Sequence, residues 1–303
     1  MRHYEGCTLC PRMCGADRVN GKTGVCRAGA LPRVAHSMLH MWEEPSISGK
    51  NGSGTVFFSG CPLGCVYCQN SKISRDYVGA EYDSSALSAL FLRLQEEGAH
   101  NINLVTATHF VPHVIEAVSM ARERGLSVPI VYNTSGYERT ETIDMLGGTA
   151  DIYLTDIRYA QAKTASAYSR AADYPDVAWQ ALAHMVAQTG MPVLDEAGMM
   201  RRGVIVRLLL LPGHLIEAKQ ILRRVYSTYG DGVYISLMSQ YTPTREAALA
   251  DSILGRRVTA YEYASLVEYA RTIGVSLAYT QEGSAAEESF IPHFEPEKME
   301  KSL

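Results

Sequence analysis

The sequence predicts an α/β fold, in the form of a partial (β/α)6 barrel of the TIM type with an N-terminal cysteine-rich metal-binding appendage. Three observations support this prediction. Short apolar runs alternate with helix-like segments from residue 55 onward, polar residues follow the apolar runs, and four of the seven cysteines lie within the first 26 residues. Alternating strands and helices form parallel sheets, because each helix carries the chain back to the start of the next strand.

The predicted strands are short apolar runs bounded by turn-forming residues. They lie at 55–58, 102–105, 129–132, 151–154, 204–211, 233–237 and 276–279. Segments with the apolar spacing of a helix lie between them, at 83–97, 111–124, 139–146, 176–189, 214–228 and 259–272. This order fits either an open doubly wound sheet or a full or partial barrel.

Polar residues at the carboxyl ends of the predicted strands favour the barrel. Thr106 and Thr108 follow the second strand, Asn133 follows the third, and Asp156 and Arg158 follow the fourth. Barrel enzymes assemble their sites from such residues, because the loops converge there over a packed interior. An open sheet would place them at one switch point, and no Gly-x-Gly-x-x-Gly follows a strand in this sequence.

The overall charge and hydropathy give no reason to expect a nucleic acid or a membrane as a partner. The 303 residues are 47% hydrophobic and 20% charged, with a formal net charge of −4. The first residues are polar, and no apolar run approaches the ~20 residues that cross a bilayer. We predict a cytoplasmic protein that binds neither nucleic acid nor membrane.

The most specific motif is Cys61-Pro-Leu-Gly-Cys65-Val-Tyr-Cys68, which follows the first predicted strand. Three thiolates can hold three irons of a [4Fe–4S] cluster and leave the fourth iron without a protein ligand. An open coordination position is where a catalytic metal binds its substrate. The alternative is a structural zinc site, which needs a fourth ligand; His40 and His100 are the nearest candidates, and neither has zinc-finger spacing.

A second group of cysteines, Cys7, Cys10, Cys14 and Cys26, provides four ligands and can close a metal site. Structural zinc and a second [4Fe–4S] cluster both fit four thiolates, and the proline after Cys10 favours iron–sulfur. An odd cysteine count in a protein expected in the cytoplasm is explained better by metal than by disulfides. We predict a metal-binding appendage at 1–50, a barrel at 51–291 and a charged tail at 292–303.

Several segments resemble the radical S-adenosylmethionine (SAM) superfamily, and within it the pyruvate formate-lyase activating enzyme-like proteins. They are Cys61 to Asn70, Leu104-Val-Thr-Ala-Thr-His109, Val131-Tyr-Asn-Thr-Ser-Gly136, Asp151-Ile-Tyr-Leu-Thr-Asp156-Ile-Arg158, Arg207 to Gly213 and Ser289-Phe-Ile-Pro292. The resemblance implies that Cys61, Cys65 and Cys68 hold a [4Fe–4S] cluster whose unique iron binds SAM. It also implies that an electron from the cluster cleaves SAM to a 5′-deoxyadenosyl radical, which abstracts hydrogen.

The resemblance further implies which residues contact SAM. Tyr67 would lie near the adenine, and Thr106 to Thr108 would replace the usual Gly-Gly-Glu around the methionine amino group. The other implied SAM contacts are Asn70, His109, Asn133, Asp156, Arg158 and Arg207. The family usually has Lys where this chain has Arg158, and Arg can hold a carboxylate through two hydrogen bonds. These residues also have structural interpretations, Tyr67 as core, Asn133 and Asp156 as turn or cap residues, and His109 as a buried structural histidine.

The resemblance implies a reaction and partners. The expected function is reductive SAM cleavage with installation of a glycyl radical on a partner enzyme or another protein substrate, with electrons from a flavodoxin- or ferredoxin-type donor. An alternative is a radical SAM enzyme that acts on a small molecule, because loops rather than the fold select the substrate. A non-catalytic iron–sulfur electron carrier is a third hypothesis, although a carrier has no use for an iron with a vacant position.

Overall fold

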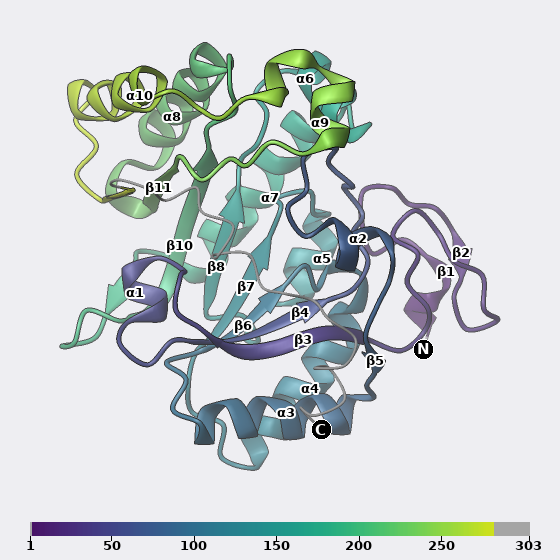
Figure 1. Ribbon diagram of the computed structural model, residues 1–303. Coiled ribbons are helices and arrows are strands. Elements are labelled where there is room, and N and C mark those ends of the chain that lie inside the picture. The colour runs from purple at the N-terminus through teal and green to yellow at the C-terminus, as the bar shows by residue number, and fades with distance from the viewer. Residues whose placement is uncertain (1, 282–303) are drawn as a thin grey trace.

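The computed structural model describes residues 2–281, so the predicted tail at 292–303 and the segment Ser289 to Pro292 lie outside the described residues. Its centre is a ten-stranded, mostly parallel sheet in the order β12-β11-β10-β8-β7-β6-β4-β3-β5, with β9 paired to β10. Within residues 2–281 this sheet does not close into a barrel, because β12 and β5 are its two edges (Figure 1). The α/β fold class is therefore confirmed, in an open, curved form.

The seven parallel strands correspond to the seven apolar runs of the sequence. They are β4 (Ser53–Phe58), β6 (Ile102–Val105), β7 (Ile130–Thr134), β8 (Ile152–Asp156), β10 (Met200–Leu209), β11 (Tyr234–Met238) and β12 (Ala278–Thr280). All residues of β4, β7 and β8 are buried. Burial on both faces is why these strands read as continuous apolar runs.

Three strands of this sheet run antiparallel to their neighbours and were not predicted. β3 (Arg33–His40) pairs antiparallel with β4, β5 (Ala80–Glu81) pairs with β3, and the short β9 (Val193–Leu194) pairs with β10. The sequence Arg-Val-Ala-His-Ser-Met-Leu-His of β3 is only partly apolar, and most of its residues are half-buried. A half-exposed strand with polar side chains gives a weak periodic signal.

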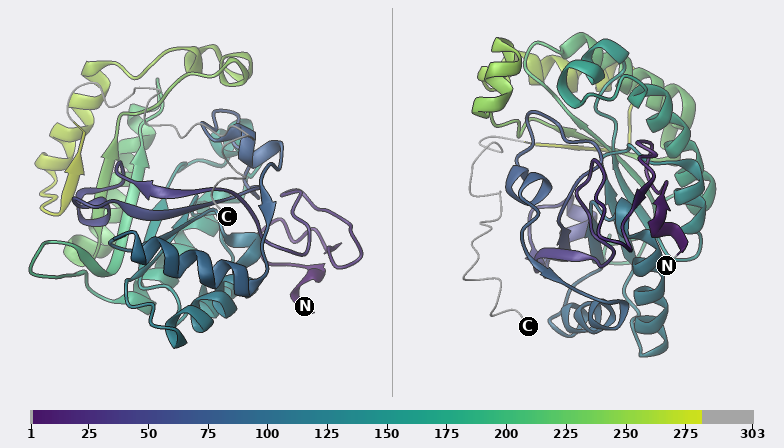
Figure 2. Two further views of the ribbon diagram at one scale, coloured as in Figure 1. Left: turned by 60° about the horizontal axis from the view of Figure 1, so that its bottom comes forward. Right: turned by 90° about the vertical axis from the view of Figure 1, so that its right-hand side faces the viewer.

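Helices gather along the outer face of the curved sheet (Figure 2). Six of them occupy the predicted helical segments: α3 (Ser84–Glu96), α4 (Val111–Glu123), α5 (Thr140–Met145), α7 (Tyr174–Thr189), α8 (Leu215–Tyr229) and α10 (Ala260–Thr272). Four other helices were not predicted, namely α1 (Pro45–Ser48), α2 (Ser71–Arg75), α6 (Ala162–Ser169) and α9 (Arg245–Ala250). The start of α10 is fixed by a capping box between Thr259 and Glu262.

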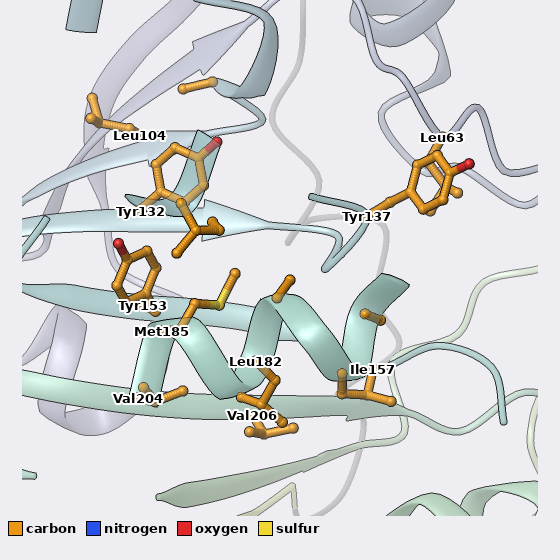
Figure 3. Close-up of a cluster of buried hydrophobic side chains, with 14 of the residues drawn as sticks. Leu63, Leu104, Tyr132, Tyr137, Tyr153, Ile157, Leu182, Met185, Val204 and Val206 are labelled. Carbon is orange, nitrogen blue, oxygen red and sulfur yellow. The ribbon is translucent and has the colours of Figure 1, made fainter. Parts of the chain in front are cut away.

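The two faces of the sheet carry different side chains, because successive residues of a strand point to opposite sides. On the outer face Tyr132, Tyr153 and Val206 pack near Leu182 and Met185 of α7 (Figure 3). On the inner face an apolar layer is formed by Val131, Ile152, Leu154, Met200 and Ile205, together with Ile47 of α1. The short helix α1 therefore fills the interior of the curved sheet at one end.

The N-terminal segment, defined here as residues 2–32, has little regular structure. Its only strands among the described residues are β1 (Glu5–Cys7) and β2 (Ala16–Asp17), which pair antiparallel. Arg18 anchors it, because its buried guanidinium donates to the carbonyl oxygens of His109 (2.6 Å) and Gly29 (2.8 Å). The Arg18 guanidinium also lies 4.2 Å from the ring centroid of Tyr4, a cation–π distance.

Candidate active site at the carboxyl ends of the strands

A cavity of about 330 Å³ lies on the inner face of the sheet. Residues from three parts of the chain line it. The parts are the loop after β4 with Cys61, Cys65 and Cys68, the carboxyl ends of the parallel strands, and the segment between β3 and α1. The polar strand-end residues expected from the sequence thus meet in one place, as the geometry of parallel strands requires.

The loop between β4 and α2, residues 59–70, is called here the cysteine loop. Its second residue, Gly60, has φ +88°, a left-handed conformation in which a side chain would be strained. A Cβ at Gly60 would also lie 2.4 Å from the carbonyl oxygen of Cys26. Glycine is therefore required there, because the N-terminal segment crosses the cysteine loop in direct contact.

In the cysteine loop Cys65 is buried and Cys61 and Cys68 are half-buried, and their thiols are close enough to affect one another. Burial raises the pKa of Cys61 to about 12, and the neighbouring thiols of Cys68 and Cys65 add to that rise. Burial also raises the pKa of Cys68. A bound metal deprotonates such thiols, so metal binding would release protons here.

The donor set fits a [4Fe–4S] cluster bound by three cysteines. Cys61, Cys65 and Cys68 line the same cavity. Among residues 2–281, no three His, Cys, Asp or Glu side chains are arranged to hold a single metal ion. A cubane does not require that arrangement, because each thiolate binds a different iron.

The strand-end residues form a charged network. Asp156 at the end of β8 accepts from Arg158 Nη2 at 2.5 Å and from Arg207 Nε at 2.9 Å. Arg207 of β10 also donates from Nη2 to Asn133 Oδ1 at 2.7 Å. The pKa of Arg207 is raised overall. Burial lowers it, but the carboxylates of Asp156, Glu43 and Glu44 raise it by more, so the guanidinium keeps its charge. The parallel register that pairs Arg207 with Asp156 across β10 and β8 creates this network.

Two glutamates of the site were missed by the sequence analysis. Glu43 and Glu44 lie between β3 and α1 and line the cavity. Glu43 accepts from Arg207 Nη1 at 3.2 Å and from the side-chain amides of Asn103 (2.9 Å) and Asn133 (3.2 Å). The adjacent acids in Glu43-Glu44-Pro45 were a visible signal, but without β3 there was no reason to place them near the strand ends.

Two predicted SAM contacts do not line the cavity. Thr108 donates from Oγ1 to Glu138 Oε1 at 2.6 Å within the interior, and His109 Nε2 lies 2.8 Å from the carbonyl oxygen of Ser59. Burial lowers the pKa of His109 to about 3, so its imidazole is neutral near pH 7. The structure gives both residues the surroundings of buried structural side chains.

The remaining predicted SAM contacts line the cavity: Tyr67, Asn70, Thr106, Asn133, Asp156, Arg158 and Arg207. Thr106 has φ +58°, which is uncommon for a β-branched residue and marks local strain. Tyr67 combines its cavity position with a core role, since its hydroxyl donates to Tyr159 Oη at 2.7 Å. Both interpretations of Tyr67 from the sequence thus have a structural counterpart.

The four N-terminal cysteines differ in exposure. Cys7, Cys10 and Cys26 are buried and Cys14 is exposed. Burial raises the pKa of Cys10 to about 12, with Cys26 and Cys7 adding to that rise. Burial also raises the pKa of Cys26, with Cys7 and Cys14 adding to the rise. The thiols therefore influence one another's pKa, but no three of them are arranged to hold a single metal ion within residues 2–281.

Arg12, between Cys10 and Cys14, ties the N-terminal segment to the cysteine loop. Its guanidinium donates to the carbonyl oxygens of Pro62 at 2.9 Å and Leu63 at 3.3 Å, both between the first two loop cysteines. It also donates to the carbonyl oxygens of Ser169 at 2.8 Å and Arg170 at 2.5 Å. One side chain therefore connects both groups of cysteines and the end of α6.

Comparison with known proteins identifies the family. A family model described as the Radical SAM superfamily matches residues 55–225. The chain belongs to the radical SAM superfamily. Members of this superfamily are enzymes, and the family implies a [4Fe–4S] cluster and SAM. No helix in the part of the chain that the structure describes is long and apolar enough to span a membrane.

The chain is also similar to one curated protein and to solved structures. The uncharacterized protein MJ0674 of Methanocaldococcus jannaschii is 25% identical over 282 residues, which cover 91% of this chain and 77% of the relative. A radical SAM methyltransferase from Sphaerobacter thermophilus has a similar fold, with TM-score 0.50, 16% identity and coverage of 77% of this chain and 67% of that chain. SuiB of Streptococcus suis bound to SAM matches at TM-score 0.45 and 9% identity, covering 74% of this radical SAM protein and 49% of SuiB.

Proposed function

We propose that this radical SAM protein is a pyruvate formate-lyase activating enzyme-like enzyme that cleaves SAM reductively and installs a glycyl radical on a partner protein. The observation that carries the proposal is one cavity lined by Cys61, Cys65 and Cys68 and by the charged pair Asp156 and Arg158. The glycyl radical step comes from the sequence resemblance. The cluster site is supported by the donor set.

In this proposal the three cysteine thiolates of the loop hold three irons, and the fourth iron faces the cavity. When bound, the cluster and SAM supply an electron and a carbon-centred radical for hydrogen abstraction. Ser74 supports this ligand set, since its hydroxyl lies 3.5 Å from Cys68 Sγ. Arg75 holds the loop backbone by donating to the carbonyl oxygen of Cys65 at 2.8 Å.

The charged network orients SAM. Asp156 accepts hydrogen bonds from two guanidiniums and positions them, and buried Arg158 Nε has no hydrogen-bond partner among residues 2–281. An unpaired N–H in a cavity is a donor available to a ligand carboxylate. We assign the SAM carboxylate to Arg158, with Asp156 fixing the plane of the guanidinium. Asn133 and Arg207 then hold the network rigid from the adjacent strands.

The N-terminal cysteines are proposed to hold a second metal centre. Four thiols coupled in a segment with little secondary structure favour metal as the element that orders it. Of the two candidates we favour a second [4Fe–4S] cluster over zinc. The contact of Cys26 with Gly60 would place such a cluster beside the cysteine loop, where it could pass electrons from a flavodoxin- or ferredoxin-type donor.

A second candidate function is hydrogen abstraction from a small molecule. The cavity volume of about 330 Å³ favours it, because the cluster and SAM would already occupy much of a cavity near the lower end of small-molecule sites, ~300–1,000 Å³. A peptide loop of a partner would need more room, or an opening of the segments that line the cavity. The two candidates share the site and differ in the hydrogen donor.

The test begins with anaerobic reconstitution, addition of SAM and dithionite, and quantification of 5′-deoxyadenosine. Reduced protein is then incubated with candidate glycyl radical enzymes and examined by electron paramagnetic resonance, with SAM-free protein as the control. A glycyl doublet on the partner supports the proposal. Cleavage of SAM with no radical on any partner moves support to the small-molecule function. A reducible cluster that never yields 5′-deoxyadenosine contradicts both and favours the electron carrier.

A further inference from the structure

One acidic residue that lines the cavity carries a charge that the rest of the site does not balance. Five charged side chains from the described part of the chain line the cavity: Glu43, Glu44, Asp156, Arg158 and Arg207. Arg158 pairs with Asp156, and Arg207 pairs with both Asp156 and Glu43. Glu44 makes no ion pair within residues 2–281. Three carboxyl groups against two guanidiniums leave Glu44 unbalanced.

Glu44 is also short of a hydrogen-bond partner. Its side chain is buried, with 7% of the residue exposed, and Oε2 has no partner among residues 2–281. Burial raises the pKa of Glu44, Arg207 opposes the rise and Glu43 adds to it. A buried acceptor without a partner destabilises the site, and a ligand donor would remove that penalty.

Aromatic rings lie around the same part of the cavity. Trp42 precedes the two glutamates, lines the cavity and is 60% exposed, so it lies at the solvent edge. Tyr279 of β12 lines the cavity as well, with its ring stacked on Tyr234 at a centroid distance of 5.3 Å. A carboxylate together with aromatic faces is a chemical environment that binds ammonium and guanidinium groups.

We infer that Glu44, in the lining of the cavity, binds a cationic group of the substrate, a primary ammonium or a guanidinium. The inference rests on the second candidate function of the same site, because it names the chemical class of the molecule that would donate hydrogen there. An amine or guanidine would donate to Glu44 Oε2, balance the third carboxyl group and present the carbons of its chain toward the cysteines that line the other part of the cavity. A lysine- or arginine-like side chain has this form.

The experiment measures binding rather than catalysis. Nα-acetyl-lysine amide and Nα-acetyl-norleucine amide are titrated calorimetrically into anaerobically reconstituted protein, with and without SAM; the second probe lacks only the ammonium. We expect the lysine probe to bind at least about tenfold more tightly, the ratio that one charge-assisted hydrogen bond provides. Agmatine, which has a guanidinium, should compete with it.

The variant Glu44→Gln keeps the size of the side chain and removes its charge, so it should lose that preference, whereas Glu246→Gln on exposed α9 should keep it. Equal binding of the two probes to the unaltered protein would overturn the inference without any variant. A preserved preference in a folded Glu44→Gln protein would overturn it too. Probe preference without SAM cleavage would reject the proposed function alone, and SAM cleavage without probe preference would reject this inference alone.

Discussion

Replacing Arg12 by Gln should release the N-terminal segment from the cysteine loop. The hydrogen bonds to Pro62 at 2.9 Å and Ser169 at 2.8 Å are short and partly buried, the bond to Leu63 is longer, and the bond to Arg170 is exposed. A hydrogen bond from a charged group contributes about 1.5–3 kcal/mol. Losing two such bonds, with a reduction for partial exposure and for one bond that Gln keeps, should therefore destabilise the attachment of the N-terminal segment by about 2–4 kcal/mol.

The assay is hydrogen–deuterium exchange of the backbone amides in residues 2–32 and in the cysteine loop. A loss of 2–4 kcal/mol should speed exchange by local opening about thirtyfold or more in both regions, while β7 and β8 stay protected. Arg12→Lys keeps the charge but not the forked donor geometry and should give an intermediate effect. Arg201→Gln removes an arginine from an exposed ion pair with Asp195 and should change neither region. Unchanged exchange in Arg12→Gln would refute the claim that this side chain joins the two parts.

Four further predictions concern the site and its supports. Cys61→Ala should abolish 5′-deoxyadenosine formation, because two thiolates do not retain the cubane; substantial product would contradict the cluster assignment. Asp156→Ala should weaken SAM binding about ten- to a hundredfold at unchanged iron content, measured by titration, since a charge-assisted contact is lost. The double variant Cys10→Ser with Cys14→Ser should lower the measured iron content from about eight to about four atoms per chain if the N-terminal centre is a [4Fe–4S] cluster. If the centre is zinc, the double variant should lose one zinc atom per chain. Burial raises the pKa of Glu138 to about 7. Between about pH 4.5 and 7 the Glu138 carboxyl group therefore keeps its proton in the folded state and has lost it in the unfolded state. The free energy of unfolding should fall by about 1.4 kcal/mol per pH unit in this range, and Glu138→Gln should remove that slope.

The sequence determined the parallel strands and the cysteine motif because both are local signals. Strands buried on both faces are apolar along their whole length, so each of the seven was visible without its neighbours. The spacing of Cys61, Cys65 and Cys68 is set within one loop, and the expectation that all three face one space needed no tertiary information. The polar residues after the strands were also predicted together, because parallel strands end at the same edge.

Only the tertiary structure decided which residues complete the site. Glu43 and Glu44 enter the cavity because β3 pairs antiparallel with β4, and a half-exposed edge-side strand leaves little trace in the sequence. His109 follows a strand end like the others, but a turn at Thr106 directs it beneath the cavity toward Ser59. Arg12 reaches Pro62 across fifty positions of sequence. Contacts of this kind depend on how distant segments pack, and neither periodicity nor spacing along the chain records that packing.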